Sequence, residues 1–210
     1  MADKGIIFSG AMVKALLDGR KTQTRRLLAD APTGDWYCDR GAVGLRWVAA
    51  PGAPSMPCRV PYAPGDRLYV REAYTVRGVY SDVVEVGYRA HERASHSEFV
   101  EQWPIETAVD AKGKRPVVTW PFYKPSTHMP RWASRLWLSV ADVRVQRVQE
   151  IKWADAVAEG MTSPLTPLSD FADLWNSLHT KPGERWEDNP FVVAVSFAVH
   201  HGNIDGGAHG

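Results

Sequence analysis

The clearest apolar patterns lie in the last third of the chain. Residues 168 to 179 are predicted to form an amphipathic helix because apolar side chains recur there at helical spacing. These side chains are Leu168, Phe171, Leu174, Trp175 and Leu178. Residues 190 to 199 are apolar on both faces, which predicts a buried central strand. A shorter helix is predicted over residues 152 to 161, where Gly160 acts as a stop signal.

A long strand is predicted to follow residue 135 and to bend along its length. Leu136, Leu138 and Val140 occupy even positions, whereas Val143 and Val145 occupy odd ones. A change of face within one strand indicates a bulge, here near residues 141 and 142. Such a bend is typical of strands that close a barrel.

The strand predicted over residues 67 to 74 carries an acid on its apolar face. Alternation places Leu68, Val70, Glu72 and Tyr74 on one side. A carboxylate on that side needs a partner or a raised pKa, because burial of a lone charge is costly. The alternative is a shift of register or an early strand end, either of which would expose Glu72.

The N-terminal part predicts a strand over residues 5 to 8 and a helix from Ser9 to Gly19. Ser9 is a suitable N-cap, and Gly19 stands where a left-handed residue often ends a helix. Four cations and two threonines follow without an acid, in the sequence Gly19-Arg20-Lys21-Thr22-Gln23-Thr24-Arg25-Arg26. A turn there could bring the Lys21 amine beside the Thr24 hydroxyl, and the positive charge favours an anionic partner. The alternative is a solvated basic turn.

Two stretches lack periodicity and are predicted to be insertions, at residues 27 to 62 and 90 to 133. The first is rich in Gly and Pro, with one short hairpin expected around residues 45 to 48. Residues 200 to 210 are rich in Gly and His and are predicted to be a flexible tail. His200, His201 and His209 are not expected to bind metal.

Cations alternate with aromatic side chains between residues 123 and 135. The cations are Lys124, His128, Arg131 and Arg135, with Tyr123 and Trp132 among them. Two prolines stiffen this loop, and the combination suits a ligand that has a phosphate and a base. The alternative is a loop that packs on the fold and leaves its cations in solvent.

Glu159 is predicted to close the short helix of residues 152 to 161. A carboxylate at that end meets the negative pole of the helix dipole, which favours its protonated form. This position is unfavourable for an acid without a role. The alternative is that Asp155 and Glu159 lie on a solvent-exposed helix face and have no functional role.

The composition is that of an ordinary globular protein and excludes a strongly basic, histone-like one. The chain has 210 residues, 44% hydrophobic and 23% charged, and a net charge of +1, so nucleic acid could be bound only by a local patch. The two cysteines, Cys38 and Cys58, lack metal-binding spacing and suit a reduced, cytoplasmic protein. Without a signal peptide or a long apolar run, the chain is expected to be soluble and free of membranes.

The order of these elements resembles that of the ASCH domain, a relative of the PUA fold. The resemblance covers residues 5 to 26, 63 to 89 and 134 to 199. It depends on Gly19 to Thr24, Pro64-Gly65-Asp66 with its strand, Glu159-Gly160-Met161, and the closing strand of residues 191 to 197. Residues 125 to 135 resemble the prophage-encoded branch of this family.

The resemblance implies an α+β fold: a mostly antiparallel PUA-like β-barrel with short flanking helices, forming one domain over residues 1 to 199. It also implies a cleft for RNA or a nucleoside. One bacterial branch shares the Gly-Arg-Lys-Thr-x-Thr motif and a Glu near the end of the short helix. Its members are amidohydrolases that deacetylate N4-acetylcytidine without a metal or another cofactor.

Motif by motif, the catalytic residues would be Lys21, Thr24 and Glu159. Lys21, with a pKa lowered by neighbouring arginines, would act as base, Thr24 as nucleophile or water-orienting group, and Glu159 as proton donor. Further substrate contacts are expected from Arg20, Arg26, Arg71, Glu72, Ser126, His128, Arg131 and Trp132. The chain is longer than members of that branch, and it is expected to be a monomer.

Two other functions remain open at this point. In one, the chain is a non-catalytic RNA-binding module, in which basic residues hold phosphates and aromatic residues stack on bases. In the other, it is a ribonuclease that uses the same cleft, with Lys21 and a hydroxyl supporting phosphodiester cleavage.

Overall fold

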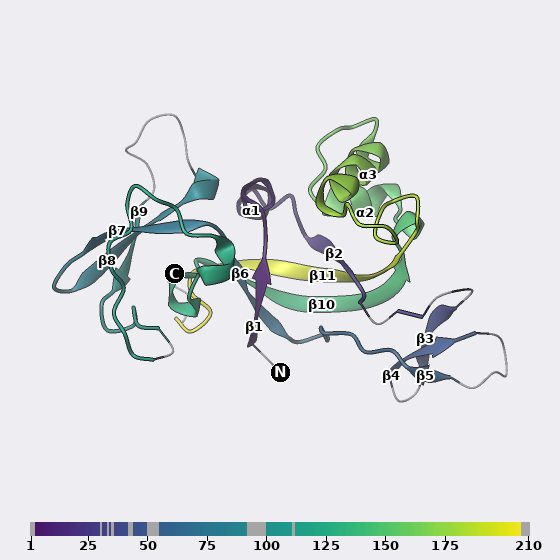
Figure 1. Cartoon of the computed structure of the whole chain (residues 1–210), viewed down its shortest axis with the longest axis horizontal. Coiled ribbons are helices and arrows are strands. Elements are labelled where there is room, and N and C mark those ends of the chain that lie inside the picture. Colours follow the sequence, from purple (N-terminus) through teal and green to yellow (C-terminus); the bar gives the residue numbers. More distant parts are fainter. Residues whose placement is uncertain are drawn as a thin grey trace. The chain divides into compact units, whose positions relative to one another are not determined.

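The computed structural model describes residues 3–29, 31–32, 34, 36–41, 44–49, 55–91, 100–110 and 112–206. The chain forms two compact units. Unit 1 contains Met1–Gly19, Gly65–Ser139 and Ala198–Gly210, and unit 2 contains Arg20–Pro64 and Val140–Phe197. Two long strands, β10 (Leu136–Arg147) and β11 (Phe191–His201), contribute residues to both units (Figure 1).

The first sheet of unit 1 is built around β6 (Arg67–Arg71). β1 (Asp3–Ile7) pairs with it in parallel, and β10 pairs with it in the antiparallel direction, with Trp137 opposite Tyr69. In unit 1 the order of neighbouring strands is β1-β6-β10-β11. One face of this sheet is buried and carries apolar residues, namely Ile6, Leu68, Val70, Leu136 and Leu138. The opposite face is half-exposed, as alternation requires.

A second sheet of unit 1 contains β7 (Tyr74–Val79), β8 (Val83–Tyr88) and β9 (Val100–Pro104). Its strands are antiparallel, and the β7–β8 register shifts between Val76 and Gly78. Helix α1 (Gly10–Leu17) begins at the predicted cap, since Ser9 Oγ accepts from Met12 N, and Gly19 has the predicted left-handed backbone with φ 68°. The β9 strand lies in a region predicted to be without periodic structure.

In unit 2, β2 (Gln23–Leu27) pairs with β11 in the antiparallel direction, and the strand order is β10-β11-β2. Helices α2 (Trp153–Ala158) and α3 (Pro167–Leu178) contact each other (Figure 1). Both were predicted within a few residues. They share an apolar core with neighbouring elements, formed by Val148, Ile151, Ala156, Phe171, Trp175 and Val192.

Unit 2 also contains a small sheet where the sequence predicts mainly loop. This sheet is antiparallel and consists of β3 (Tyr37–Gly41), β4 (Gly44–Val48) and β5 (Met56–Pro57). The hairpin expected near residue 45 is therefore part of a three-stranded sheet. Trp47 anchors this sheet by packing against Phe191, with ring centroids 4.6 Å apart. Cys38 and Cys58 are free thiols, and burial raises the pKa of Cys58 to about 12.

The fold class is α+β, and the predicted change of face in β10 is observed. Leu136, Leu138 and Val140 are buried, and the next buried position is Val143. The closed barrel is not found. Among the described residues, the strands form three separate sheets, and the hydrogen-bonded strands of none of them close into a ring.

Residues 200 to 206 differ from the predicted flexible tail. Ile204 is buried, and the Asn203 side chain donates to the backbone carbonyls of Arg131, Trp132 and Ser134. One polar side chain therefore fixes this segment, which composition alone could not indicate. The part of the prediction that concerns residues 207 to 210 lies outside the described residues.

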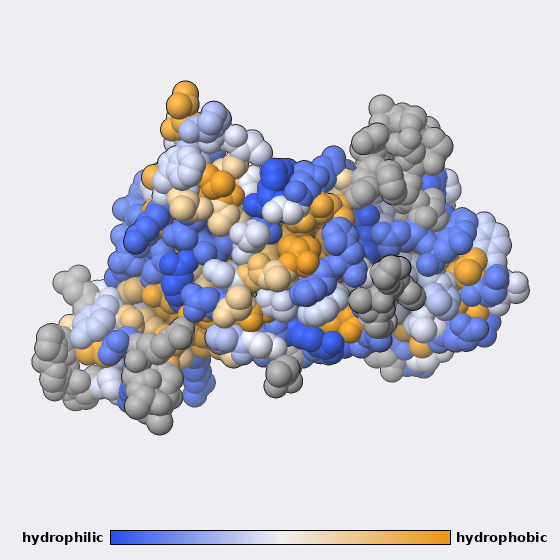
Figure 2. Space-filling view, turned by 180° about the vertical axis from the view of Figure 1, so that it is seen from behind, coloured by the Kyte–Doolittle hydropathy of each residue, from blue (hydrophilic) through white to orange (hydrophobic). Residues whose placement is uncertain are grey.

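No described helix is long and apolar enough to cross a membrane. Hydrophilic residues cover much of the face shown in Figure 2, with apolar residues in smaller groups between them. Large apolar side chains that are more than half exposed include Val117, Val118 and Phe122.

Asp3 is expected to make a pH-dependent contribution to the free energy of unfolding through its contacts in unit 1. Hydrogen bonds from Arg67, and then from Arg131, lower its pKa from 3.8 to about 2. A carboxyl whose pKa is lower in the folded state stabilises the fold above the unfolded pKa and loses this effect as the pH falls through the folded pKa. Between about pH 5 and pH 2, wild-type protein should therefore lose more free energy of unfolding than Asp3→Asn.

The difference should stay within about 1 kcal/mol, because these ion pairs are only partly buried. Urea unfolding of both proteins at several pH values measures it. Parallel curves for the two proteins would show that Asp3 contributes nothing to acid sensitivity.

Candidate functional site

A buried lysine and a buried glutamate meet in unit 2. Lys21 Nζ donates to Glu159 Oε2 at 2.7 Å and to the Glu159 backbone carbonyl at 2.8 Å. The two residues are 1% and 4% exposed. The structure thus brings together two of the three predicted catalytic residues, 138 positions apart in the chain.

Arg25 is a third member of this cluster and was not among the predicted site residues. Its Nη1 donates to Glu159 Oε1 at 3.0 Å, so each carboxylate oxygen of Glu159 contacts a cation. The same nitrogen contacts Gln23 Oε1 at 2.6 Å, and Arg25 Nη2 lies 3.2 Å from Asp155 Oδ2. The signal that could have identified Arg25 is its spacing from Gln23 and Lys21, since alternate residues of an extended chain share a face.

Backbone hydrogen bonds to the end of α2 and to β11 position the segment that carries Lys21. Thr22 N donates to the carbonyl of Ala158, the last residue of α2, and the Thr22 carbonyl accepts from Phe197 N on β11. Glu159 is the C-cap of α2, and Gly160 follows with a left-handed φ of 99°. The short helix therefore ends beside the start of β2, which brings Glu159 to Lys21.

Thr24 lies on a strand rather than in the turn that the sequence suggests. It is buried and is opposite Val195 in the β2–β11 register. Because side chains alternate along β2, the Thr24 hydroxyl is on the other face from Gln23 and Arg25. The strand therefore does not turn Thr24 toward the contact between Arg25 and Glu159.

Burial has the largest effect on the ionisation of Lys21. It lowers the pKa of the amine, Glu159 opposes this effect, and Arg26 and Arg25 add to it. Arg26 is half-buried, which lowers its pKa, and it interacts with Tyr62 and Glu159. Arg20 donates to the backbone carbonyl of Gly160 at 3.1 Å. The cluster is thus a water-poor site with an excess of cations.

Glu72 is in unit 1, directly after β6, which ends at Arg71 and not at residue 74 as predicted, although the predicted alternation of buried positions holds. It is 1% exposed, and Arg135 donates to its two carboxylate oxygens at 2.8 and 3.0 Å. Burial raises the pKa of Glu72, and the hydrogen bonds and charge of Arg135 oppose this. The sequence predicts that Glu72 needs a partner, and Arg135 is that partner.

Three other residues predicted to contact the substrate, Arg71, Ser126 and His128, also lie in unit 1. Arg71 donates to the Thr127 carbonyl, and the His128 carbonyl accepts from Tyr74 Oη at 3.1 Å. Ser126 lines a hollow of about 460 Å³ at the start of α1, which Lys14 and Arg89 also line. The backbone of the loop that carries these residues forms two short 3₁₀ turns, at Ser126–His128 and Arg131–Ala133.

Arg131 is partly exposed but is engaged in ion pairs, and Trp132 is buried. Arg131 Nη2 contacts Asp3 Oδ2 at 2.6 Å and Asp205 Oδ1 at 2.5 Å. Trp132 belongs to the buried core of unit 1, together with Tyr88, Met129 and Ala133. Its ring stabilises the unit by packing, because an apolar surface of this size is better removed from water.

Within the described part of the chain, no group of three or more His, Cys, Asp or Glu residues is arranged to hold a metal ion. The His200 side chain interacts instead with Ser139 Oγ, at 2.8 Å.

Comparisons with known proteins identify no family for this chain. No family model matches it, and no curated protein matches it. Among solved structures, it is similar to protein EF3133 from Enterococcus faecalis V583, described as family DUF984. The identity is 11%, the TM-score is 0.43, and the match covers 100% of this chain and 86% of the other. A likeness of this degree assigns neither a family nor a function.

Proposed function

We propose that the chain is an ASCH-type, PUA-like protein whose Lys21–Glu159 pair removes the acyl group from an N4-acylated cytidine or a related nucleoside. The observation that supports this is the contact of 2.7 Å between a buried amine and a buried carboxylate. The sequence resemblance to the amidohydrolase branch, through Lys21, Thr24 and Glu159, agrees with the same residues.

The reaction needs a base for the attacking oxygen and an acid for the leaving nitrogen. Lys21 and Glu159 hold one proton between them, and burial lowers the pKa of Lys21. When that proton lies on Glu159, the Lys21 amine can take a proton from water, and the oxygen attacks the acyl carbon. Glu159 then gives its proton to the departing N4 amine as the C–N bond breaks. The products are a carboxylic acid and the free nucleoside.

Water is assigned as the nucleophile because alternation along β2 directs Thr24 to the opposite face from Arg25. Thr24→Val tests the alternative role of a threonine nucleophile, since valine keeps the shape of the side chain and removes the hydroxyl. Arg25 Nε is buried and has no hydrogen-bond partner in the described part of the chain. This donor is available to stabilise the oxyanion that develops on the acyl oxygen.

The burial of Lys21, Arg25 and Glu159 favours a catalytic role over the binding of RNA phosphates. Lys21 and Arg25 each contact the Glu159 carboxylate, so they are poorly placed to hold an RNA phosphate. A phosphate-binding patch needs exposed cations and has no use for a buried acid. Because Lys21 is 1% exposed, the amide must displace a neighbouring side chain to reach it.

The test is to incubate the purified protein with N4-acetylcytidine and, separately, with end-labelled single-stranded RNA. Chromatography should show cytidine and acetate from the first, and the RNA should remain intact. Lys21→Met should abolish the release of cytidine. Lys181→Met is the matched control, because Lys181 is an exposed lysine of the same unit.

Two results would contradict the assignment. Cleavage of the labelled RNA that is lost in Lys21→Met would make the site a ribonuclease. Failure of the wild-type protein to hydrolyse any N4-acylated cytidine would leave Lys21 and Glu159 as a structural ion pair.

A further inference from the structure

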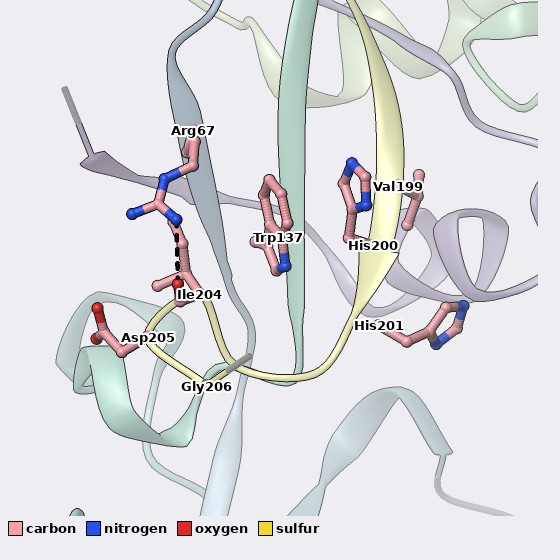
Figure 3. A pocket seen from close by; sticks show the side chains of 8 residues that line it. All are labelled: Arg67, Trp137, Val199, His200, His201, Ile204, Asp205 and Gly206. Carbon is pink, nitrogen blue, oxygen red and sulfur yellow. Dashed lines mark hydrogen bonds between the residues drawn. The ribbon is translucent and has the colours of Figure 1, made fainter. Parts of the chain in front are cut away.

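Trp137 lines a hollow of about 590 Å³ in unit 1, and both faces of its ring are already covered. The ring is stacked on His200, with centroids 3.9 Å apart, and the Arg67 guanidinium carbon lies 5.8 Å from the centroid of the Trp137 ring. Figure 3 shows Trp137 between these two side chains. The hollow therefore offers no open ring to a ligand, whereas a loop beside β7 leaves apolar side chains uncovered.

This loop, residues 117 to 122 of unit 1, is named here the apolar loop. Four large apolar side chains project from it into solvent, namely Val117, Val118, Trp120 and Phe122. They are 62%, 54%, 39% and 78% exposed. Apolar side chains gathered on one short segment are typical of a surface that another body covers, because their removal from water is favourable.

Backbone hydrogen bonds hold the apolar loop at the edge of β7. Thr119 N and Trp120 N both donate to the Val76 carbonyl, at 2.9 and 3.1 Å, and Thr119 Oγ1 accepts from Val76 N at 2.9 Å. Just beyond the loop, Lys124 and Tyr74 exchange two backbone hydrogen bonds, at 2.7 and 3.2 Å. The loop is therefore ordered before it meets a partner, which lowers the entropic cost of binding.

Cations stand on both sides of the apolar loop in the sequence. Lys112, Lys114 and Arg115 precede it and Lys124 follows it, whereas no acid occurs between residues 111 and 125. The nearest acid along the chain, Asp110, accepts from the backbone N–H groups of Lys112 and Lys114 and so closes a turn. The three preceding cations are exposed. This part of unit 1 is therefore strongly positive, although the net charge of the whole chain is only +1.

We propose that the apolar loop attaches unit 1 to the surface of a membrane that contains anionic lipids. Phe122 and the two valines enter the boundary between headgroups and acyl chains, and the flanking cations meet the negative headgroups. The affinity of such an attachment increases with the buried apolar area and with the attraction between basic residues and anionic lipid. Trp120 suits the same boundary, where tryptophan is enriched.

The make-up of the apolar loop favours lipid over protein or nucleic acid as its partner. A standard protein–protein interface uses about 20–30 residues on each side, far more than this loop supplies. Nucleic acid is bound by cations and stacked rings, and Val117 and Val118 offer it neither. The expectation that the chain is free of membranes was based on the lack of a signal peptide and of a long apolar run, and attachment to a membrane surface requires neither.

The experiment measures co-sedimentation of the full chain with vesicles of phosphatidylcholine alone and of equal parts phosphatidylcholine and phosphatidylglycerol. The chain should sediment with the mixed vesicles and stay in solution with the neutral ones, and added salt should weaken the binding. Phe122→Ser should lower the partition constant about 10-fold, because the ring no longer enters the apolar layer. Lys114→Gln should lower it about 5-fold.

Each variant has a matched control in unit 2. Leu165 is 88% exposed and Lys181 is an exposed lysine, so Leu165→Ser and Lys181→Gln should bind as the wild type does. The inference is overturned if the chain ignores the mixed vesicles, binds both kinds of vesicle equally, or binds as tightly with Phe122→Ser as with Leu165→Ser. Labelled polyglutamate or single-stranded RNA that binds through Phe122, while the mixed vesicles do not bind, would make the loop a site for an acidic macromolecule and the lipid assignment wrong.

Discussion

Replacing Arg135 by methionine is expected to lower the free energy of unfolding by about 3–5 kcal/mol. Arg135 donates to both carboxylate oxygens of Glu72, and both side chains are almost fully buried. The guanidinium also lies 4.1 Å above the ring of Tyr88 and 3.7 Å from Glu101. Methionine fills most of the volume but leaves the Glu72 carboxylate buried without a cation. Urea unfolding measures the loss.

The double variant Glu72→Gln/Arg135→Met should recover much of this loss, because no buried charge remains. Arg185→Met is the control, since Arg185 forms an exposed pair with Glu187, and it should change stability by less than about 0.5 kcal/mol. A double variant no more stable than Arg135→Met would show that the lost packing, and not the unpaired charge, causes the effect.

The defect of Arg135→Met should also depend on pH. Burial already raises the pKa of Glu72, and removal of its cation raises it further. A carboxyl whose pKa is raised in the folded state stabilises the fold below the unfolded pKa, and the effect is lost as the pH rises through the folded pKa. The stability of Arg135→Met should therefore be closest to that of the wild type in mild acid, and the difference between them should be largest in alkali.

The second large effect concerns the turnover of N4-acetylcytidine, and it depends on the function proposed for Lys21 and Glu159. Glu159→Gln and Lys21→Met should each lower kcat by about 10²–10⁴-fold, the range expected for general acid–base groups. Because the two groups exchange one proton, removal of both should cost little more than removal of either. Initial rates for the two single variants and the double variant test this.

Glu187→Gln is the matched control, because Glu187 is an exposed glutamate of the same unit. Each variant should be checked by circular dichroism, since the Lys21–Glu159 contact also stabilises the fold. Multiplicative losses in the double variant would show that the two residues act independently, and the shared-proton mechanism would then be wrong.

The sequence predicts those parts of the fold that depend on local pattern. The helix at residues 167 to 178 follows from its apolar stripe, and the change of face in β10 follows from the parity of Val140 and Val143. The burial of Glu72 follows from alternation with Leu68 and Val70. Each of these needs only neighbours within a few residues, so one sequence suffices.

The contacts between distant segments could not be predicted in the same way. Nothing local to Glu72 indicates Arg135 as its partner, and nothing near Glu159 indicates Arg25. The small sheet of residues 37 to 57 was missed because its strands are short and include glycine and proline. The packing of residues 200 to 206 depends on the Asn203 amide, whose partners lie about 70 positions earlier.

The interleaving of the chain between the two units limits how the protein can be dissected. Unit 1 is assembled from three separate stretches of chain and unit 2 from two. A continuous fragment that contains every residue of unit 2 also contains residues 65–139 of unit 1, and one that contains every residue of unit 1 contains unit 2 as well. Limited proteolysis and truncation libraries are therefore unsuited to assigning activities to the units. Point substitutions in the intact polypeptide are the appropriate tool.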